Sequence, residues 1–323
     1  IHQPICMEFI KQRFGTEPPG HIWSVAFHPT FPLIAIGSDE DSTIIYDIST
    51  SPPNVKYYLE HGTEYACCVA FHYSSPLLAV GVGDNSSIIY DISNIYKSLP
   101  TVKYHFKHHK NDIQSLAFHS TLPLFATCSD DYTTILYNMV NMYNTVPQAV
   151  KYHLSHHSSY VESVAFHPSR LLFATGSADK TTIIYDMSTL PPTIRHHCKH
   201  HTDAVCSIAF HPHLLFLASG SHDNSTILYD ISTSPPTVKF HLKDHISNVY
   251  SIDFHHSLPL LATSSSDKST IIYDLTDMSP SIKHHLKQDH TCDIHSVTFH
   301  LSLSLFITGS EDGTAILYNL NKM

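Results

Sequence analysis

The sequence predicts an all-β fold, a closed β-propeller of seven blades with four antiparallel strands in each blade. Three observations predict it. A Phe followed by a His recurs seven times, at intervals of 44 to 48 residues. A Tyr stands 19 residues after each of these Phe residues. Each period also holds four short apolar stretches, rich in β-branched and aromatic residues and too short for helices.

The repeated Phe and Tyr residues fix where each unit lies in the chain. The Phe residues are Phe27, Phe71, Phe118, Phe166, Phe210, Phe254 and Phe299. The Tyr residues are Tyr46, Tyr90, Tyr137, Tyr185, Tyr229, Tyr273 and Tyr318. Because the offset is the same in all seven units, we interpret residues 1–323 as a single propeller domain.

The fourth unit shows how one blade is built. Turn-forming residues separate its stretches, notably Ser177–Lys180 and Pro191-Pro192. We expect its strands at Val161–Phe166, Leu171–Thr175, Thr182–Asp186 and Ile194–Cys198. In other units the outer strand alternates polar and apolar residues, as in Lys239–Lys243. Lys on an exposed edge discourages pairing with another molecule, so we interpret these Lys residues as an edge device and not as a nucleic-acid site.

The N-terminal segment is predicted to close the ring. The last unit ends at Asn319–Met323 and has no outer strand of its own. Segment Ile5–Lys11 fits the outer-strand pattern of Val55–Glu60. We therefore expect residues 1–13 to form the outer strand of the seventh blade, which removes both open edges.

The units resemble the repeat of the WD40 family along almost the whole chain. A His stands nine residues before the Phe in five units, an Asp stands six residues before the Tyr, and a Thr or Ser stands four residues before that Asp. The resemblance implies that a hydrogen-bonded His–Ser/Thr–Asp–aromatic network holds each blade. The implied network residues are His109, Thr127, Asp131, Tyr137, His157, Thr175, Asp179, Tyr185, His201, Ser219, Asp223, Tyr229, His245, Thr263, Asp267, Tyr273, His290, Thr308, Asp312 and Tyr318.

Two departures from the family pattern stand out. Tyr replaces the Trp of the family's Trp-Asp pair in all seven units, and a phenol can still donate to the Ser or Thr hydroxyl. The first two units are also eroded. Ile36 and Glu40 stand where Thr and Asp are expected in the first unit, and the second unit has Val80 and a His61 displaced by one residue. We expect these two blades to be the less rigid ones.

Composition and charge exclude several classes of partner. The net charge is −10 and only three Arg residues are present, which argues against nucleic acid and anionic membrane surfaces. No apolar run approaches a membrane span of about 18 residues. Seven Cys residues without a C-x-x-C spacing predict reduced thiols, and hence the cytoplasm, with the nucleus as an alternative. Because the chain begins with Ile1 and not Met, we expect it to be part of a larger chain or complex.

The 29 His residues do not predict a metal site. Most of them occupy positions that the repeat fixes, so they are spread around a ring and do not converge. Ser, His and Asp occur together in five near-identical units, which indicates a structural device because an enzyme needs one asymmetric site. We therefore expect no metal, no cofactor and no catalytic residue.

Function is expected where the repeats differ. The position four residues before each Phe reads Trp23, Cys67, Gln114, Glu162, Cys206, Tyr250 and His295. The resemblance implies that this zone lines the mouth of the central channel, where peptides dock. We predict partner-binding residues there at Trp23, Gln114, Glu162, Tyr250 and His295. Alternatively, Trp23 fills the core of a blade that has lost its network.

Two insertions between the third and fourth strands form a second candidate surface. They carry Tyr96 and Tyr143 and belong to neighbouring blades, so they could share one face. Repeat insertions often mark a binding face. Neutral drift of the surface explains them equally simply.

The sequence thus favours a non-catalytic scaffold that presents the channel mouth and loops to protein or peptide partners. One alternative is an enzyme with its site at the channel, but the seven mouth residues include only one carboxylate, Glu162, and one His, His295. Another is a substrate adaptor of a ubiquitin ligase. In that subfamily an Arg stands two residues after the Asp of Trp-Asp. Ser occupies that place here, at Ser49, Ser93, Ser188 and Ser232.

Overall fold

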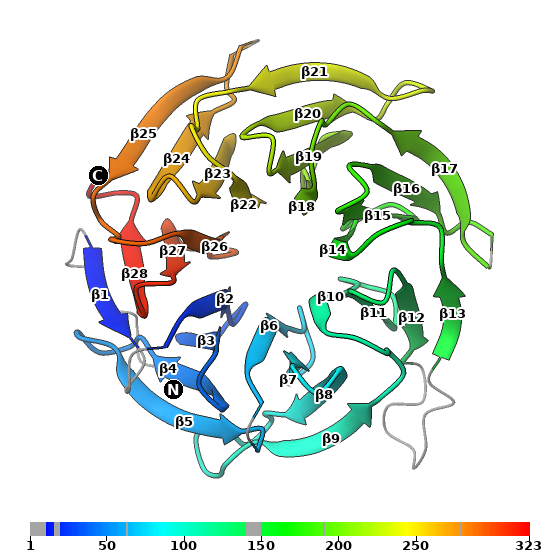
Figure 1. Cartoon of the computed structure of the whole chain (residues 1–323). Coiled ribbons are helices and arrows are strands. Elements are labelled where there is room, and N and C mark those ends of the chain that lie inside the picture. Colours follow the sequence, from blue (N-terminus) through cyan, green and yellow to red (C-terminus); the bar gives the residue numbers. More distant parts are fainter. Residues whose placement is uncertain (1–10, 16–19, 63, 140–149, 190, 278) are drawn as a thin grey trace.

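Seven four-stranded antiparallel sheets surround a central axis in the computed structural model of the chain (Figure 1). The structure describes residues 11–15, 20–62, 64–139, 150–189, 191–277 and 279–323. The predicted propeller of seven blades with four strands each is confirmed. In the fourth blade, each strand begins within one residue of its expected start.

The strands of blades 1 to 6 follow the chain from the axis outward. Blade 1 contains β2 (Ile22–Phe27), β3 (Leu33–Ser38), β4 (Ser42–Asp47) and β5 (Asn54–Glu60). Blade 2 contains β6 (Ala66–Phe71), β7 (Leu77–Val82), β8 (Ser86–Asp91) and β9 (Thr101–Phe106). Blade 3 contains β10 (Ile113–Phe118), β11 (Leu124–Ser129), β12 (Thr134–Asn138) and β13 (Val150–Leu154).

The remaining blades have the same order. Blade 4 contains β14 (Val161–Phe166), β15 (Leu172–Ser177), β16 (Thr182–Asp186) and β17 (Thr193–Cys198). Blade 5 contains β18 (Val205–Phe210), β19 (Phe216–Ser221), β20 (Thr226–Asp230) and β21 (Thr237–Leu242). Blade 6 contains β22 (Val249–Phe254), β23 (Leu260–Ser265), β24 (Ser269–Asp274) and β25 (Ser281–Lys287). Blade 7 combines β26 (Ile294–Phe299), β27 (Leu305–Ser310) and β28 (Thr314–Asn319) with β1 (Lys11–Gly15).

An N-terminal strand closes the ring, as predicted; its described part, Lys11–Gly15, begins inside the predicted segment 1–13 and ends two residues beyond it. β1 pairs antiparallel with β28, from Lys11 opposite Tyr318 to Gly15 opposite Thr314. The expected strand Ile5–Lys11 shares only Lys11 with it, and residues 1–10 lie outside the described part of the chain. Packing of Phe14 sets the register, because its ring contacts Tyr46 of blade 1 at a centroid distance of 4.8 Å. The alternation of apolar residues alone did not reveal this contact.

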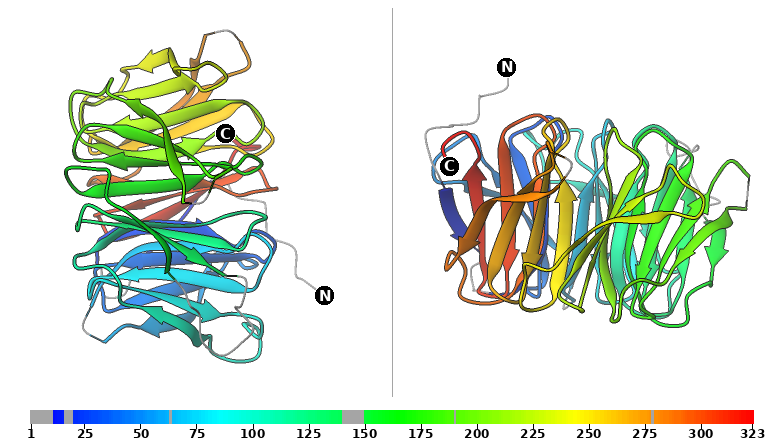
Figure 2. Two further views of the ribbon diagram at one scale, coloured as in Figure 1. Left: turned by 90° about the vertical axis from the view of Figure 1, so that its right-hand side faces the viewer. Right: turned by 90° about the horizontal axis from the view of Figure 1, so that it is seen from above.

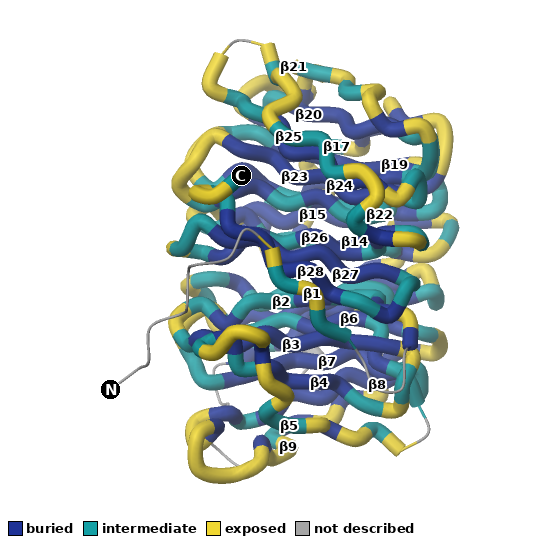
Figure 3. The backbone as a smooth tube through the Cα atoms, turned by 90° about the vertical axis from the view of Figure 1, so that its left-hand side faces the viewer, coloured by how far each residue is buried: buried dark blue, intermediate teal, exposed yellow. Residues whose placement is uncertain are grey.

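The hydrophobic core lies between neighbouring blades. Figure 2 shows the ring from two sides as a thick disk, and Figure 3 shows that its middle strands are buried. All six residues of β15 are buried, whereas most of the outer strand β17 is exposed. Each sheet is covered on both faces by its neighbours, so its inner strands are apolar throughout. In the described residues, no helix has the length and hydropathy that a membrane crossing requires.

The His after each repeated Phe holds the turn that follows it. Nδ1 of His167 accepts the backbone N–H groups of Ser169 and Arg170, each at 3.2 Å. The same pair of bonds is made by His28, His72, His119, His211, His255 and His300. Because Nδ1 accepts, these rings carry their proton on Nε2 and are neutral. These seven His residues, one in each blade, make up about a quarter of all 29 His residues and have a structural role.

Candidate functional site

One hydrogen-bonded network recurs in blades 3 to 7. In blade 4, Nδ1 of His157 lies 2.9 Å from Oδ2 of Asp179, and its Nε2 lies 2.7 Å from Oγ1 of Thr175. The amide of Ser158 donates to the same Asp179 oxygen at 3.0 Å. The equivalent contacts join His109 to Asp131 and Thr127, His201 to Asp223 and Ser219, His245 to Asp267 and Thr263, and His290 to Asp312 and Thr308.

Hydrogen bonding keeps the Asp of each network ionised. Burial alone would raise the pKa of Asp179, but hydrogen bonds from His157, Thr181 and the Ser158 amide outweigh burial and hold this pKa well below its usual range. The pKa of the equivalent carboxyl is lowered by the same balance in Asp131, Asp223, Asp267 and Asp312. The hydroxyls in these networks are fully buried, so the networks are not accessible to a substrate.

A Tyr completes each of the five networks. The hydroxyl of Tyr185 has Thr175 as a hydrogen-bond partner and also lies 3.2 Å from Nδ1 of His156. The equivalent bond to the network Thr or Ser is made by Tyr137, Tyr229, Tyr273 and Tyr318. The residue before the network His therefore faces the phenol.

Blades 1 and 2 lack the network, and His61 does not act as its displaced His. Nε2 of His61 lies 2.9 Å from Oγ1 of Thr43 in blade 1, and its Nδ1 lies 3.2 Å from the Tyr90 hydroxyl in blade 2. Burial lowers the pKa of His61 to about 4, against a smaller opposing effect of Asp84. His61 therefore occupies the repeat position of His156, which faces a Tyr, and it also connects two blades.

The channel mouth brings together the seven residues of the variable position. Trp23, Cys67, Gln114, Glu162, Cys206, Tyr250 and His295 line one cavity of about 630 Å³. Each side chain stands near the start of an innermost strand, and these strands surround the axis in Figure 1. Ile22 and Val25 on either side of Trp23 pack into the core between blades, whereas Trp23 faces the cavity.

One side of the mouth is aromatic. The ring centroid of His295 lies 4.6 Å from that of Trp23 and 4.5 Å from that of Tyr250. His21 and His222 extend this row of rings at its two ends. Nε2 of His295 also lies 2.9 Å from Oε1 of Glu311, which orients the imidazole. The Nε1 atom of Trp23 is buried and has no hydrogen-bond partner in the described residues.

The opposite side of the mouth carries Glu162, and the carboxyl of Asp130 lies near it. Burial raises the pKa of Glu162 to about 7, and the nearby charge of Asp130 adds to the shift. Burial also raises the pKa of Asp130, although the side-chain amide of Gln114 donates to it at 2.9 Å. The second oxygen of Asp130 is buried without a partner in the described part of the chain. Of these two unpaired polar atoms, the Nε1 donor of Trp23 belongs to a residue that lines the cavity, whereas Asp130 is not among the lining residues.

Sequence reasoning missed four residues that line this cavity: Asp39, Tyr65, His222 and Glu311. Asp39, His222 and Glu311 directly precede the turn position that holds the network Asp in most units. This position also differs between blades, so the search for variable positions could have found it. Tyr65 lies two residues before Cys67 and donates its hydroxyl to Asp112.

Of the two loop residues, the structure describes only Tyr96. Tyr96 packs edge-on against Phe31 at a centroid distance of 5.6 Å, and Nζ of Lys56 lies 4.4 Å from its ring centre. Tyr143 lies outside the described residues. Among the described residues, no group of three or more His, Cys, Asp or Glu side chains could hold a metal ion. The six described Cys residues are unpaired.

Comparison with known families agrees with this geometry. The family model of the WD40 repeat, described as WD domain, G-beta repeat, matches residues 12–47, 100–138, 148–186, 192–230, 236–274 and 281–319. The chain belongs to the WD40 repeat family, whose propellers are typically protein-interaction scaffolds. The unmatched residues 48–99 include all of blade 2 up to its outer strand. No curated protein matches the chain.

Proposed function

We propose that this propeller is a non-catalytic scaffold that binds a segment of a partner protein at the channel mouth. One observation carries the proposal. The same repeat position in all seven blades lines a single cavity of about 630 Å³, and its side chains are of five chemical kinds: aromatic, thiol, amide, carboxyl and imidazole. Blades 3 to 7, in contrast, repeat the same network contacts. A binding site needs asymmetry, and the mouth is where the ring provides it.

The lining favours a partner that presents a basic side chain. Asp39, Glu162 and Glu311 contribute carboxylates to the cavity, and no Lys or Arg is among the residues that line it. The row of rings at Trp23, His295 and Tyr250 offers faces against which a cation can pack. With a pKa of about 7, Glu162 is only partly ionised at neutral pH. A bound basic group favours its ionised form, so binding is coupled to loss of the Glu162 proton, and affinity should increase as the pH rises through about 7.

The networks support a non-catalytic role. The five copies of Ser or Thr, His and Asp are equivalent, and the hydroxyl and His of each copy are buried, whereas a hydrolase needs one exposed triad. The Ser residues two positions after Tyr-Asp also have a local role, because Ser49, Ser93, Ser188 and Ser232 donate their amides to the preceding Asp. These positions offer no support for the ubiquitin-ligase adaptor hypothesis.

Affinity purification with paired baits tests the proposal. Partners captured by the wild-type protein are identified by mass spectrometry, and their affinities are then measured for the Trp23→Ala/Tyr250→Ala double variant. Loss of one anchor residue costs about 2 kcal/mol, roughly thirtyfold in affinity. Tyr58→Ala is the control, because this Tyr is exposed on β5 and away from the cavity. Full binding by the double variant, with its melting temperature lowered, would identify the mouth aromatics as core residues and reject the proposal.

A further inference from the structure

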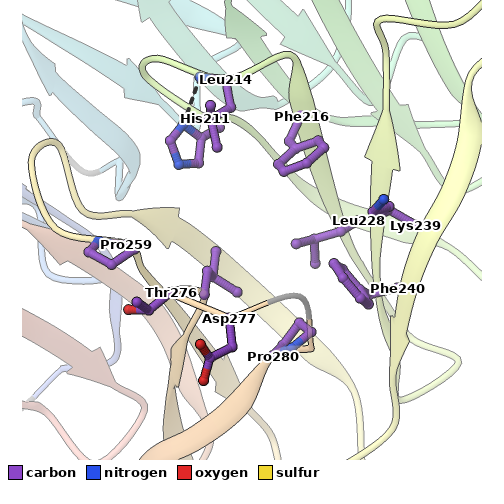
Figure 4. Close-up of a pocket in the computed structure, with 11 residues that line it drawn as sticks. His211, Leu214, Phe216, Leu228, Lys239, Phe240, Pro259, Thr276, Asp277 and Pro280 are labelled. Atoms are coloured by element: carbon purple, nitrogen blue, oxygen red, sulfur yellow. Dashed lines mark hydrogen bonds between the residues drawn. The ribbon is translucent and has the colours of Figure 1, made fainter.

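A second cavity lies between blades 5 and 6, on the face of the ring opposite the mouth. It has a volume of about 340 Å³ and is mostly apolar. Leu214, Phe216, Leu228 and Phe240 of blade 5 lie on one side and Pro259 of blade 6 lies on the other (Figure 4), and Leu275 also lines the cavity. Phe216 begins β19 and Leu275 follows β24, so they lie at the strand ends opposite to the mouth residues. Leu214 is 51% exposed at its rim. We call this cavity the blade 5–6 groove.

The chain itself fills the equivalent groove between blades 1 and 2. Ile95 is only 2% exposed and packs in one cluster with Leu33, Ile45 and Ile92, against which Phe31 and Tyr57 also pack. The five side chains that pack with Ile95 have counterparts in the blade 5–6 groove at the same repeat positions. Leu33 corresponds to Phe216, Ile45 to Leu228, Ile92 to Leu275, Phe31 to Leu214 and Tyr57 to Phe240. The two grooves are therefore the same structural feature. Ile95 fills one of them, and the described residues leave the other open.

A short turn delivers the residues that fill the blade 1–2 groove. The amide of Ile95 donates to Ile92 O at 3.1 Å, and the amide of Ser98 donates to Asn94 O at 2.9 Å. Tyr96, next to Ile95, packs on Phe31 and lies under the ammonium of Lys56. The turn belongs to the nine residues, 92–100, that connect β8 to β9.

The blade 5–6 groove lacks the connection that would fill it in this way. Only six residues, 275–280, connect β24 to β25. Lys239 occupies the repeat position of Lys56 and lines the groove, so the cation that covers Tyr96 has a counterpart here. The blade 5–6 groove therefore has the same apolar lining and the same Lys as the blade 1–2 groove. Counterparts of Ile95 and Tyr96, which complete the blade 1–2 groove, are absent from the described residues of the connection from β24 to β25.

We propose that the blade 5–6 groove binds a segment of a partner protein that places an aliphatic side chain and the following aromatic side chain on one turn, as Ile95 and Tyr96 do within this chain. The aliphatic side chain packs between Phe216, Leu228 and Leu275. The aromatic ring packs against Leu214 with the Lys239 ammonium above it. This site is separate from the mouth and does not depend on the function proposed for the mouth.

The probe for this proposal is a fluorescein-labelled peptide of residues 92–100 of this chain, blocked at both ends. Fluorescence anisotropy should show saturable binding to the wild-type protein. The Leu214→Glu variant should bind at least tenfold more weakly, because it places a carboxylate at the apolar rim. Leu258→Glu is the matched control, since Leu258 is exposed at the same repeat position of the next blade and does not line the groove. A peptide with Ser in place of both Ile95 and Tyr96 should not bind.

Four outcomes would overturn the proposal. They are the absence of saturable binding, equal binding to Leu214→Glu and the wild-type protein, and binding only after Met278→Ser, which would mean that the protein's own connection occupies the groove. The fourth is a dimer in light scattering that Leu214→Glu dissociates, which would identify a second copy as the occupant. Binding at the mouth should be unchanged in Leu214→Glu, so failure here leaves the mouth proposal intact.

Discussion

Blades 3 to 7 and blades 1 and 2 reach the same four-stranded shape with different polar contacts. Each of the five later blades is held from inside, by a His that connects the turn Asp to a hydroxyl on the second strand. Blades 1 and 2 have Ile36 and Val80 at that hydroxyl position, and both side chains are fully buried. The apolar core therefore suffices to form a blade, and the network is an addition to it.

Contacts between blades replace contacts within blades in this part of the ring. His61 connects Thr43 to Tyr90, Tyr65 donates to Asp112 of blade 3, and Ile95 fills the groove between blades 1 and 2. These contacts hold neighbouring blades together, but they do not hold the turn between the second and third strands of either blade. The comparison indicates that stability is distributed unevenly around the ring.

The largest expected effect comes from removing the strand that joins the two ends of the ring. Deletion of residues 1–15 leaves β28 without its outer partner and removes Phe14 from the contact with Tyr46. The exposed edges should lower the melting temperature by many degrees or cause aggregation. Deletion of residues 1–10 keeps β1 and is the control. Equal melting of both truncated proteins and the full chain would show that β1 does not stabilise the ring.

Acid should destabilise both regions, because turn His residues with a lowered pKa occur in blade 2 as well as in blades 3 to 7. Burial lowers the pKa of His167, His211 and His300 to about 4 and also lowers the pKa of His72, His119 and His255. The unfolded chain binds protons at these groups near pH 6.5 and the folded chain does not. Their contribution to stability is thus complete above pH 6.5 and is lost as the pH falls toward 4.

Carboxyls with raised pKa values oppose this trend. Burial raises the pKa of Glu162 to about 7 and that of Asp253 to about 6, and it also raises the pKa of Asp130 and Asp293, so these groups favour the folded state as the pH falls. Six His residues should outweigh them. Melting temperatures measured from pH 8 to pH 4.5 should therefore decrease, and a constant or rising melting temperature would contradict the assignment of neutral turn His residues.

A pair of substitutions separates the two regions directly. Asp179→Ala removes the shared partner of His157 and the Ser158 amide in blade 4, and we expect a loss of roughly 2–4 kcal/mol in the free energy of unfolding. Glu40→Ala alters the equivalent position of blade 1, where no such His is present, and should cost far less. Chemical denaturation measures both. Similar midpoints for the two variants would sink the idea that the network adds stability to five blades.

The contacts that replace the network should be weaker individually. Ile95→Ala leaves a cavity in the blade 1–2 groove, and we expect a cost of about 2 kcal/mol because buried apolar contacts are lost. Asn94→Ala changes an exposed neighbour in the same turn and is the control. If denaturation midpoints of both variants equal that of the wild-type protein, Ile95 does not connect the two blades.

The rotational repeat explains which features could be predicted from sequence. Strand positions, the five network residue sets and the variable position at Trp23 and Tyr250 follow from counting, because equivalent residues occupy equivalent places in every blade. The pairing register between β1 and β28 could not be predicted by counting along the repeat, because it depends on where Phe14 packs. The sequence shows that the connection from β8 to β9 is longer than the connection from β24 to β25. It does not show that Ile95 fills one groove while the described residues leave the other open, because this depends on contacts between blades.

Native-state hydrogen exchange tests the central claim most directly, because it reads each blade in the intact protein. Residues of β3, β7 and β15 are equally buried, so burial alone predicts equal protection of these strands. If the network gives blade 4 additional stability, amides of β15 and β16 should exchange more slowly than those of β3, β4, β7 and β8, and Asp179→Ala should remove the difference. Equal protection of the two sets of strands in the wild-type protein, or no response to Asp179→Ala, would contradict the account.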